Sequence, residues 1–179
     1  MKFDIVSFNE SHVKDGFDCG IAELNKYLFR QVRQDVRKNY ATLFVAVENA
    51  TNKVIGYYTL SNANVRLDVI PVDLRKRLPK YAEIPAIRLG RLAVNITAQG
   101  YGIGVQLLAD AAIRSILNVY AWTIMIVDAK DEKACDFYKK YEFEPLLDDE
   151  RHLFIPRSDF ELNFLRAMEI DRNVTSLSG

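Results

Sequence analysis

One segment constrains this chain more than any other: Gln99-Gly100-Tyr101-Gly102-Ile103-Gly104. It follows an apolar stretch, 86–94, that predicts a strand, and it precedes a pattern that predicts a helix to about residue 117. The three glycines at alternate positions permit positive φ angles and close approach to a ligand. The first turn of the helix offers unpaired N–H donors to the same point. This order predicts an anion site suited to phosphate, although a simple turn accounts for the same glycines.

The spacing of these glycines excludes two common nucleotide-binding motifs. It differs from the dinucleotide fingerprint G-x-G-x-x-G, and no Gly-Lys-Ser/Thr follows as in a P-loop. Two cysteines, Cys19 and Cys135, and two histidines, His12 and His152, are too few and too scattered for a typical zinc site or a Ser-His-Asp relay. We therefore expect no metal, and we interpret each histidine as structural.

Length and composition predict a globular protein. The 179 residues, 49% hydrophobic and 27% charged, indicate one domain over 1–157, followed by a C-terminal helix and polar tail over 158–179. Basic and acidic residues number 24 each, so the overall charge does not indicate a nucleic-acid binder. Apolar runs fall far short of the roughly 18 residues that span a bilayer. No signal peptide is visible, and we predict a cytoplasmic protein without membrane contact.

The hydrophobic pattern predicts strands and helices in one domain, with the strands at 42–47 and 54–60 paired antiparallel through a hairpin loop. Residues 62–85 hold three prolines and predict an irregular excursion with one short helix near 72–77. A Ser158-x-x-Glu161 capping box predicts the start of the C-terminal helix. The remaining predicted elements are strands at 3–8, 42–47, 54–60, 121–127, 143–147 and 152–155, and helices at 21–38 and 131–140.

Several segments together resemble a known family. Arg91-Leu92-Ala93-Val94, then Gln99-x-x-Gly102-x-Gly104, then Asp128 to Phe137-Tyr138 resemble the acetyl-coenzyme A binding core of the GCN5-related N-acetyltransferases (GNAT). A closer likeness, from about residue 3 to 157, is to the toxin branch of bacterial type II toxin–antitoxin pairs. It is carried by the segments 17–20, 56–61, 89–94, 127–129 and 153–156.

The resemblance implies a mixed α/β (α+β) GNAT fold, with a central, mostly antiparallel sheet flanked by helices. It also implies acetyl-coenzyme A as co-substrate and a set of binding residues. The pantetheine arm would pair with the backbone of Leu92, Ala93 and Val94, and Phe137 would pack beside it. Asp131 stands where many members have an asparagine near the cofactor. The pyrophosphate would lie on the loop formed by Gln99, Gly100, Tyr101, Gly102, Ile103 and Gly104.

Tyr138 matches the tyrosine that the family uses as general acid. Attack of an amine on a thioester expels a thiolate that needs a proton, and a tyrosine with pKa ~10 carries one at neutral pH. In isolation Tyr138, one of nine tyrosines, would be read as a packing residue. One departure is Glu142, where the family has glycine. If that position is left-handed, a residue other than glycine costs about 1–2 kcal/mol.

The toxin branch acetylates the α-amine of an aminoacyl-tRNA and thereby blocks translation. An α-amine of pKa ~8 is partly neutral at pH 7, unlike a lysine at ~10.4, and no general base stands out. Glu48, Glu83 and Asp128 are conceivable bases but more ordinary as surface carboxylates. Basic side chains could hold the RNA backbone or form a solvated face, and Arg91 could equally be structural. The candidate RNA contacts are Arg33, Arg37, Arg75, Lys76, Arg77, Arg88 and Arg91.

The same likeness implies a protein antitoxin, of the ribbon-helix-helix type, and permits a homodimer. Two alternatives remain open at this point. One is a GNAT enzyme that acetylates a protein N-terminus, a lysine or a small-molecule amine. The other is a non-catalytic module that binds coenzyme A or a partner, which an inert Tyr138→Phe substitution would favour.

Overall fold

The computed structural model describes residues 2–162, which divide into two compact units. The first unit contains residues 2–61 and 89–111, and the second contains residues 62–88 and 112–162. The chain passes from one unit to the other within two long strands, β3 (Val54–Arg66) and β4 (Glu83–Val94). Each unit is described by itself below.

The strands belong to one seven-stranded mixed sheet with the order β1-β2-β3-β4-β5-β7-β6. The ladders β1–β2, β2–β3, β5–β7 and β6–β7 are antiparallel. This confirms the predicted α+β class and its mostly antiparallel character, including the hairpin over 42–60.

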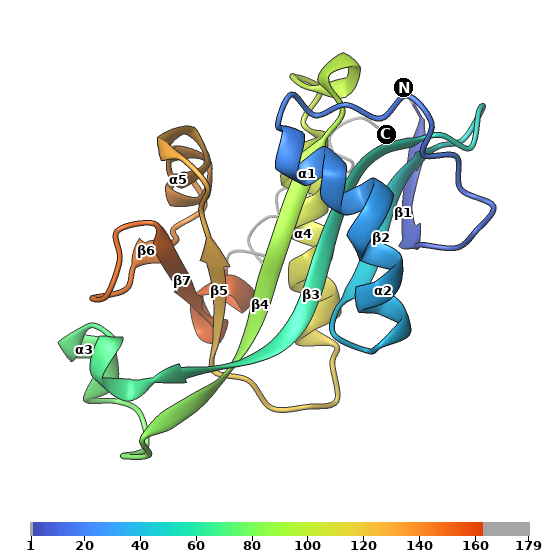
Figure 1. Cartoon of the computed structure of the whole chain (residues 1–179). Helices are drawn as coiled ribbons and strands as arrows, with labels where there is room; N and C mark the ends of the chain where they lie inside the picture. Colours follow the sequence, from blue (N-terminus) through green and yellow to red (C-terminus); the bar gives the residue numbers. More distant parts are fainter. Residues whose placement is uncertain (1, 163–179) are drawn as a thin grey trace, which may run out of the picture. The chain divides into compact units, whose positions relative to one another are not determined.

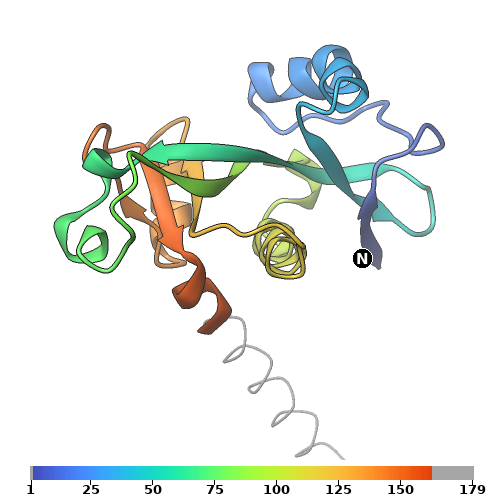
Figure 2. The same cartoon turned by 90° about the horizontal axis from the view of Figure 1, so that it is seen from below.

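The first unit buries consecutive side chains of its central strands, at residues 43–47 and 54–59, because helices cover both faces (Figures 1 and 2). Val45 and Tyr57, which are cross-strand partners, are fully buried together with Leu28 and Val32. The N-terminal helices lie on one face of these strands and α4 lies on the other, as Figures 1 and 2 show. The elements are β1 (Phe3–Ser7), α1 (Ala22–Lys26), a π-helical turn η1 (Tyr27–Gln31), α2 (Val32–Arg37), β2 (Thr42–Glu48), η3 (Ile96–Ala98) and α4 (Ile103–Ile116).

The second unit has its own core. Ile124 and Ile126 of β5 pack with Phe154 of β7 and with Ile84 of β4. Its elements are η2 (Leu67–Val69), α3 (Val72–Arg75), β5 (Ile124–Asp128), α5 (Glu132–Lys139), β6 (Glu144–Pro145) and β7 (His152–Pro156). A helix begins at residue 157 and is described as far as residue 162.

The predicted irregular excursion over 62–85 is wrong at both ends. β3 continues to Arg66 and β4 already begins at Glu83, so regular strand replaces the expected loop there. Pro85 is tolerated within β4. Proline lacks an N–H donor, but the backbone contact at this position uses its carbonyl, which accepts the N–H of Thr123 at 2.9 Å. Pro71 precedes α3 as its N-cap and Pro79 follows it, so the short predicted helix is present.

Two predicted helices differ in detail. The helix expected over 21–38 is interrupted by the π-helical turn η1. The capping box at Ser158 is wrong, because the helix has already begun at residue 157 and the Ser158 hydroxyl bonds to Asp159. The rest of the predicted C-terminal helix and tail, 163–179, lies outside the described residues. Over residues 2–162, no helix is long and apolar enough to cross a membrane.

Candidate active site

The glycine loop opens α4 as its sequence predicts. Gly100 and Gly102 have φ angles of 83° and 75°, in the left-handed region that favours glycine. A Cβ atom at Gly100 would meet no atom within 4 Å, so the backbone conformation, not a lack of space, demands glycine there. Helical bonding starts where the N–H of Gln106 donates to the carbonyl of Gly102 at 3.2 Å. By helix geometry, the N–H groups of the preceding turn are therefore available to an anion.

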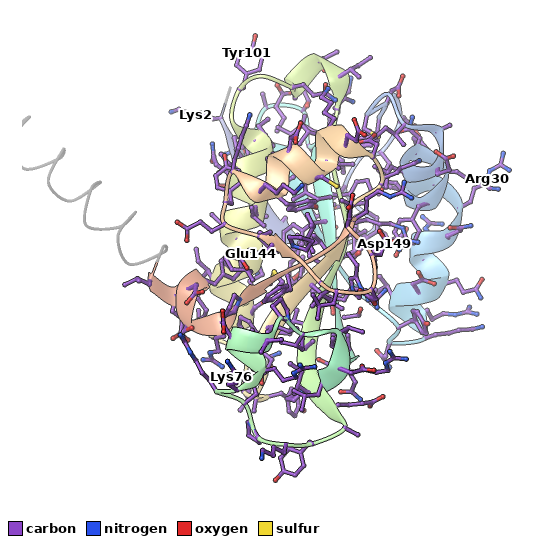
Figure 3. The ribbon with its side chains drawn as sticks, turned by 90° about the vertical axis from the view of Figure 1, so that its left-hand side faces the viewer. Lys2, Arg30, Lys76, Tyr101, Glu144 and Asp149 are labelled. Carbon is purple, nitrogen blue, oxygen red and sulfur yellow. The ribbon has the colours of Figure 1, made fainter. Side chains whose placement is uncertain are left out.

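Two side chains of the loop, Tyr101 and Ile103, lie in different surroundings. Tyr101 is 69% exposed and projects from the loop in Figure 3, whereas Ile103 is buried and anchors the start of α4. Gly104 is the second residue of α4. The loop therefore exposes backbone at its centre and the aromatic side chain of Tyr101 at its edge.

Gln99 ties the loop to the end of β4. Its Nε2 donates to the carbonyl of Val94 at 3.0 Å and to the carbonyl of Cys19 at 3.2 Å. These contacts fix the loop against the strand segment Leu92-Ala93-Val94, in which Ala93 is buried and its two neighbours are half-buried. The structure thus brings the predicted pantetheine and pyrophosphate segments together within one unit.

A second brace comes from the turn at residues 17–20. The Asp18 carboxylate accepts the N–H of Gly20 at 2.8 Å and the Asn25 side-chain amide at 2.7 Å. These hydrogen bonds, the Gly20 one foremost, hold the pKa of Asp18 below its ordinary value. The Asp18 carbonyl accepts the N–H of Ile96 at 2.7 Å, just ahead of the glycine loop. The turn at residues 17–20 therefore holds the segment that leads into the glycine loop.

Gly56 permits close packing beneath the same segment. A Cβ atom there would lie 3.2 Å from the Ala93 carbonyl oxygen and 3.0 Å from Leu107. Such contacts are tighter than real Cβ atoms commonly make, so β3, β4 and α4 meet closely only because this residue is glycine.

In the second unit, Asp131 begins α5 as its N-cap. Its Oδ1 accepts the N–H of Ala134 at 2.8 Å, which satisfies one of the unpaired donors of the first turn. Asparagine and aspartate share this capping ability, so the cap explains how Asp131 serves at a position where the family often has asparagine.

Tyr138 lies near the end of α5 within a group of aromatic rings. Its ring centroid is 5.2 Å from that of the half-buried Phe137 and 5.3 Å from that of Phe143. Phe137 also contacts Tyr141 at 5.3 Å. Tyr138 is only 7% exposed, and burial raises its pKa above the ordinary tyrosine value. The phenol therefore holds its proton throughout the neutral range, as a general acid must.

Glu142 adopts the left-handed conformation expected at the family's glycine position, with φ of 65°. The helix end nevertheless closes normally, because the Tyr138 carbonyl accepts the N–H of Tyr141 at 2.9 Å and of Phe143 at 3.3 Å. The turn is kept at a conformational cost of about 1–2 kcal/mol.

The basic residues of the first unit fall into two groups. Arg91 places its guanidinium 3.6 Å from the ring centroid of Tyr27, whose hydroxyl donates to Asp35 at 3.0 Å. Burial, with the Asp35 hydrogen bond, raises the pKa of Tyr27 to about 12. Arg33 pairs with Glu10. The second group lines a groove of about 840 Å³, from which Arg30 extends outward in Figure 3. The charged residues that line this groove are Glu10, Arg30, Arg33, Arg37 and Lys38.

The basic residues of the second unit are partly engaged with carboxylates or carbonyls. Arg88 donates to Asp128 at 2.8 Å, and Arg75 reaches the carbonyl of Asp68 at 3.4 Å. Lys76, the C-cap residue of α3, is labelled in Figure 3 and lies 3.7 Å from Asp73, and Arg77 is exposed. Arg88 is thus held by a partner, and Arg75 is half-buried, whereas Lys76 and Arg77 are exposed.

Among the three carboxylates considered as general bases in the sequence, Asp128 lies beside both an arginine and a histidine. Besides Arg88, it faces His152 across the β5–β7 ladder, with 3.9 Å between Asp128 Oδ1 and His152 Nε2. Asp148 lies 3.2 Å from the other ring nitrogen of His152. Sequence reasoning treated His152 as structural, and no local signal reveals this pairing because it depends on strand register. Within residues 2–162, no three His, Cys, Asp or Glu side chains form a group suited to a metal ion.

Comparison with known proteins agrees with this geometry. The acetyltransferase (GNAT) domain profile matches residues 39–145. A Mycobacterium tuberculosis (strain ATCC 25618 / H37Rv) protein named tRNA-acetylating toxin is 29% identical over 145 residues, covering 80% of this chain and 85% of its own.

Two solved structures of the toxin AtaT are similar along most of their length. AtaT complexed with acetyl-methionyl-tRNAfMet is 31% identical, with a TM-score of 0.81 over 91% of this chain and 98% of its own. A tyrosine-to-phenylalanine variant of AtaT, bound to the C-terminus of the antitoxin AtaR and acetyl-CoA, is 30% identical, with a TM-score of 0.75 over 90% of this chain and 98% of its own. The chain therefore belongs to the GNAT acetyltransferase family.

Proposed function

We propose that this protein transfers an acetyl group from acetyl-coenzyme A to the α-amine of an aminoacyl-tRNA and so blocks translation, as the toxin of a toxin–antitoxin pair. The observation that carries the proposal is the likeness to AtaT in complex with acetyl-methionyl-tRNAfMet, which extends over 91% of this chain. The relative named tRNA-acetylating toxin supports the same substrate class.

The first unit supplies the proposed binding site for acetyl-coenzyme A. The pyrophosphate would accept hydrogen bonds from the exposed backbone of the glycine loop, whose two positive-φ glycines leave that backbone uncovered by side chains. The pantetheine arm would lie along Leu92, Ala93 and Val94. The complex of AtaT with acetyl-CoA supports this co-substrate.

The second unit supplies the proposed general acid. The amine lone pair attacks the thioester carbonyl, a C–N bond forms, and the C–S bond breaks as the thiolate takes a proton from Tyr138. Burial among aromatic rings keeps that proton in place until the sulfur leaves. Phe137, beside Tyr138, would contact the pantetheine arm.

The RNA backbone would contact basic side chains at the surface of both units. In the first unit these are Arg33 and Arg37, on the rim of the basic groove. In the second they are Arg75, Lys76 and Arg77. Arg88 and Arg91, which already have partners, would act near the acceptor end by positioning neighbouring groups.

The proposal extends to partners. The AtaT structure with the C-terminus of AtaR supports a protein antitoxin for this chain, and we expect one of the ribbon-helix-helix type. We also expect a homodimer. A tRNA substrate would place the activity in the cytoplasm.

The test is incubation of the purified protein with radiolabelled acetyl-coenzyme A and a total pool of charged tRNA. We expect label in the RNA fraction, released by mild alkali as N-acetylamino acid because the aminoacyl ester hydrolyses. The same pool after deacylation is the matched control and should stay unlabelled, since it lacks the α-amine. Label found on peptides or polyamines instead, with charged tRNA unlabelled, would overturn the proposal in favour of another amine substrate.

A further inference from the structure

His152 of the second unit forms a group with three charged side chains, Arg88, Asp128 and Asp148. Asp128 ends β5 and His152 begins β7, and the two are cross-strand partners. Arg88 donates to Asp128 Oδ2 at 2.8 Å, while Asp128 Oδ1 lies 3.9 Å from His152 Nε2. Both carboxylate oxygens of Asp148 lie 3.2 Å from His152 Nδ1. Asp148 belongs to the turn between β6 and β7, where Figure 3 labels its neighbour Asp149.

The sheet explains why these groups meet. Ile124 and Ile126 point from β5 into the core of the second unit, and Asp128 continues the same alternation to the end of the strand. Phe154 and His152 do the same on β7. The charged group therefore sits at the end of an apolar strand face, where the core gives way to solvent. The Asp128 side chain is 54% exposed there and the His152 side chain 18%.

The contact with Asp148 selects the tautomer of the neutral imidazole. A carboxylate only accepts hydrogen bonds, so His152 Nδ1 carries the proton and Nε2 keeps its lone pair in the neutral ring. Nε2 is buried and has no hydrogen-bond partner among residues 2–162. Buried ring nitrogens without a partner are uncommon, so this atom is poised for a group that the protein itself does not provide.

Asp128 makes that position suitable for an ammonium group. Arg88 occupies one of its oxygens and orients the carboxylate, while the second oxygen faces Nε2 across a gap too long for a hydrogen bond. A primary ammonium in this gap would donate one N–H to Asp128 and another to Nε2. The arrangement follows the Asp–His logic of known general bases, with Asp148 as the orienting carboxylate.

We infer that His152 accepts the proton of the substrate ammonium, with Asp148 orienting the ring and Asp128 binding the ammonium beside it. The inference rests on the proposed function, because it names the group that removes a proton from the substrate amine.

The proton transfers balance over the whole reaction. An N–H bond of the ammonium breaks, its electron pair stays on nitrogen, and the proton goes to His152 Nε2. The freed lone pair forms the C–N bond. The thiolate leaves with the proton of Tyr138, and the phenolate regains a proton from the new amide nitrogen. His152 then releases its proton to solvent.

The first test is the pH profile of kcat/KM for aminoacyl-tRNA acetylation by His152→Gln. Glutamine can still donate toward Asp148 but takes up no proton. We expect a loss of about 100-fold at slightly acidic pH that narrows as the pH rises, because the substrate amine then loses its proton to solvent. His12→Gln is the matched control: His12 is the other histidine, it bonds to Asn9 in the first unit, and its variant should follow the wild-type profile.

A merely structural role would lower the activity of His152→Gln by the same factor at every pH, with lowered thermal stability. That outcome, or a profile equal to wild type, overturns the inference. Acetyl-coenzyme A affinity measured by calorimetry should be unchanged in His152→Gln.

A second measurement does not depend on the substrate. Nitrogen-15 NMR of the wild-type protein at neutral pH should show Nδ1 of His152 protonated and Nε2 bare. Asp148→Ala should move the proton toward Nε2, whereas Asp149→Ala, which alters the adjacent carboxylate, should not. Unlabelled charged tRNA would overturn the proposed function, whereas this spectrum separately tests the ring geometry that the inference requires. A protonated Nε2 in the neutral wild-type ring overturns it.

Discussion

The two units present different kinds of chemical group. The first unit offers backbone: two glycines with positive φ, the N–H groups at the start of α4, and a strand end whose neighbouring loop is fixed by Gln99. The second offers side chains: the buried phenol of Tyr138 and the charged group around His152. An anion is recognised by fixed donors, whereas proton transfer needs titratable atoms. Under the proposed function, the first unit provides most of the cofactor-binding groups and the second provides the groups that transfer protons.

The largest expected effect separates acid chemistry from cofactor binding. Tyr138→Phe should lower the rate of acetyl transfer by about 100-fold to 10,000-fold, the range typical of a lost general acid. Its affinity for acetyl-coenzyme A, measured by calorimetry, should stay near wild type, because the substitution removes only a hydroxyl and the proposed glycine-loop and strand contacts belong to the first unit. Tyr141→Phe, which keeps the contact with Phe137, is the matched control and should stay active. Equal loss of affinity in Tyr138→Phe would break the division between the units.

The next effect compares the basic surfaces of the two units. The groove of the first unit has four cations against one carboxylate. The second unit has an open groove of about 510 Å³ near α3, whose charged lining residues are Arg66, Arg75 and Lys80 against Asp68 and Glu83. Reversal of Arg33 and Arg37 to glutamate should therefore weaken tRNA binding more than reversal of Arg75 and Arg77. The slope of log affinity against log salt concentration should fall by about one for each lost phosphate contact. Unchanged slopes in both double variants would rule out these contacts.

A smaller effect tests the backbone site. Gly102→Ala should weaken acetyl-coenzyme A binding by about tenfold, because a left-handed alanine costs about 1–2 kcal/mol and displaces the N–H donors when it relaxes. Gly16→Ala is the control: Gly16 has φ of 81° and open space around it, but lies outside the loop. It should lose similar stability in a thermal melt and keep its affinity. Equal affinities in the two variants would remove the glycine loop from the binding site.

The smallest effect compares one strained residue in each unit. Glu142→Gly should raise the free energy of unfolding by about 1 kcal/mol, because glycine adopts the left-handed conformation without strain. Asn39→Gly, at φ of 56° in the first unit, should change it by much less, since asparagine tolerates that conformation. Denaturant titration measures both. An unchanged midpoint for Glu142→Gly would show that its side chain contributes an offsetting interaction.

Much of the fold was predictable because its signals are local. The β2–β3 hairpin, the strand before the glycine loop, α4 and α5 follow from hydrophobic periodicity and turn residues a few positions apart. The errors came where tertiary contacts outweigh local signals. Residues 62–66 and 83–85 were expected to be irregular because of nearby prolines, yet they complete β3 and β4 in a sheet whose neighbours satisfy their backbone.

The candidate site divides along the same line. By itself the sequence determined the glycine loop and the helix that begins near Asp131, because backbone conformation and helix spacing are set by adjacent residues. The proposed role of Tyr138 came from the resemblance to the family motif. Only the tertiary structure decided that Arg91 packs on Tyr27, that Arg88 meets Asp128 forty positions away, and that His152 stands between two carboxylates. Those pairings depend on strand register and packing, in which a shift of one residue would turn each side chain to the other face.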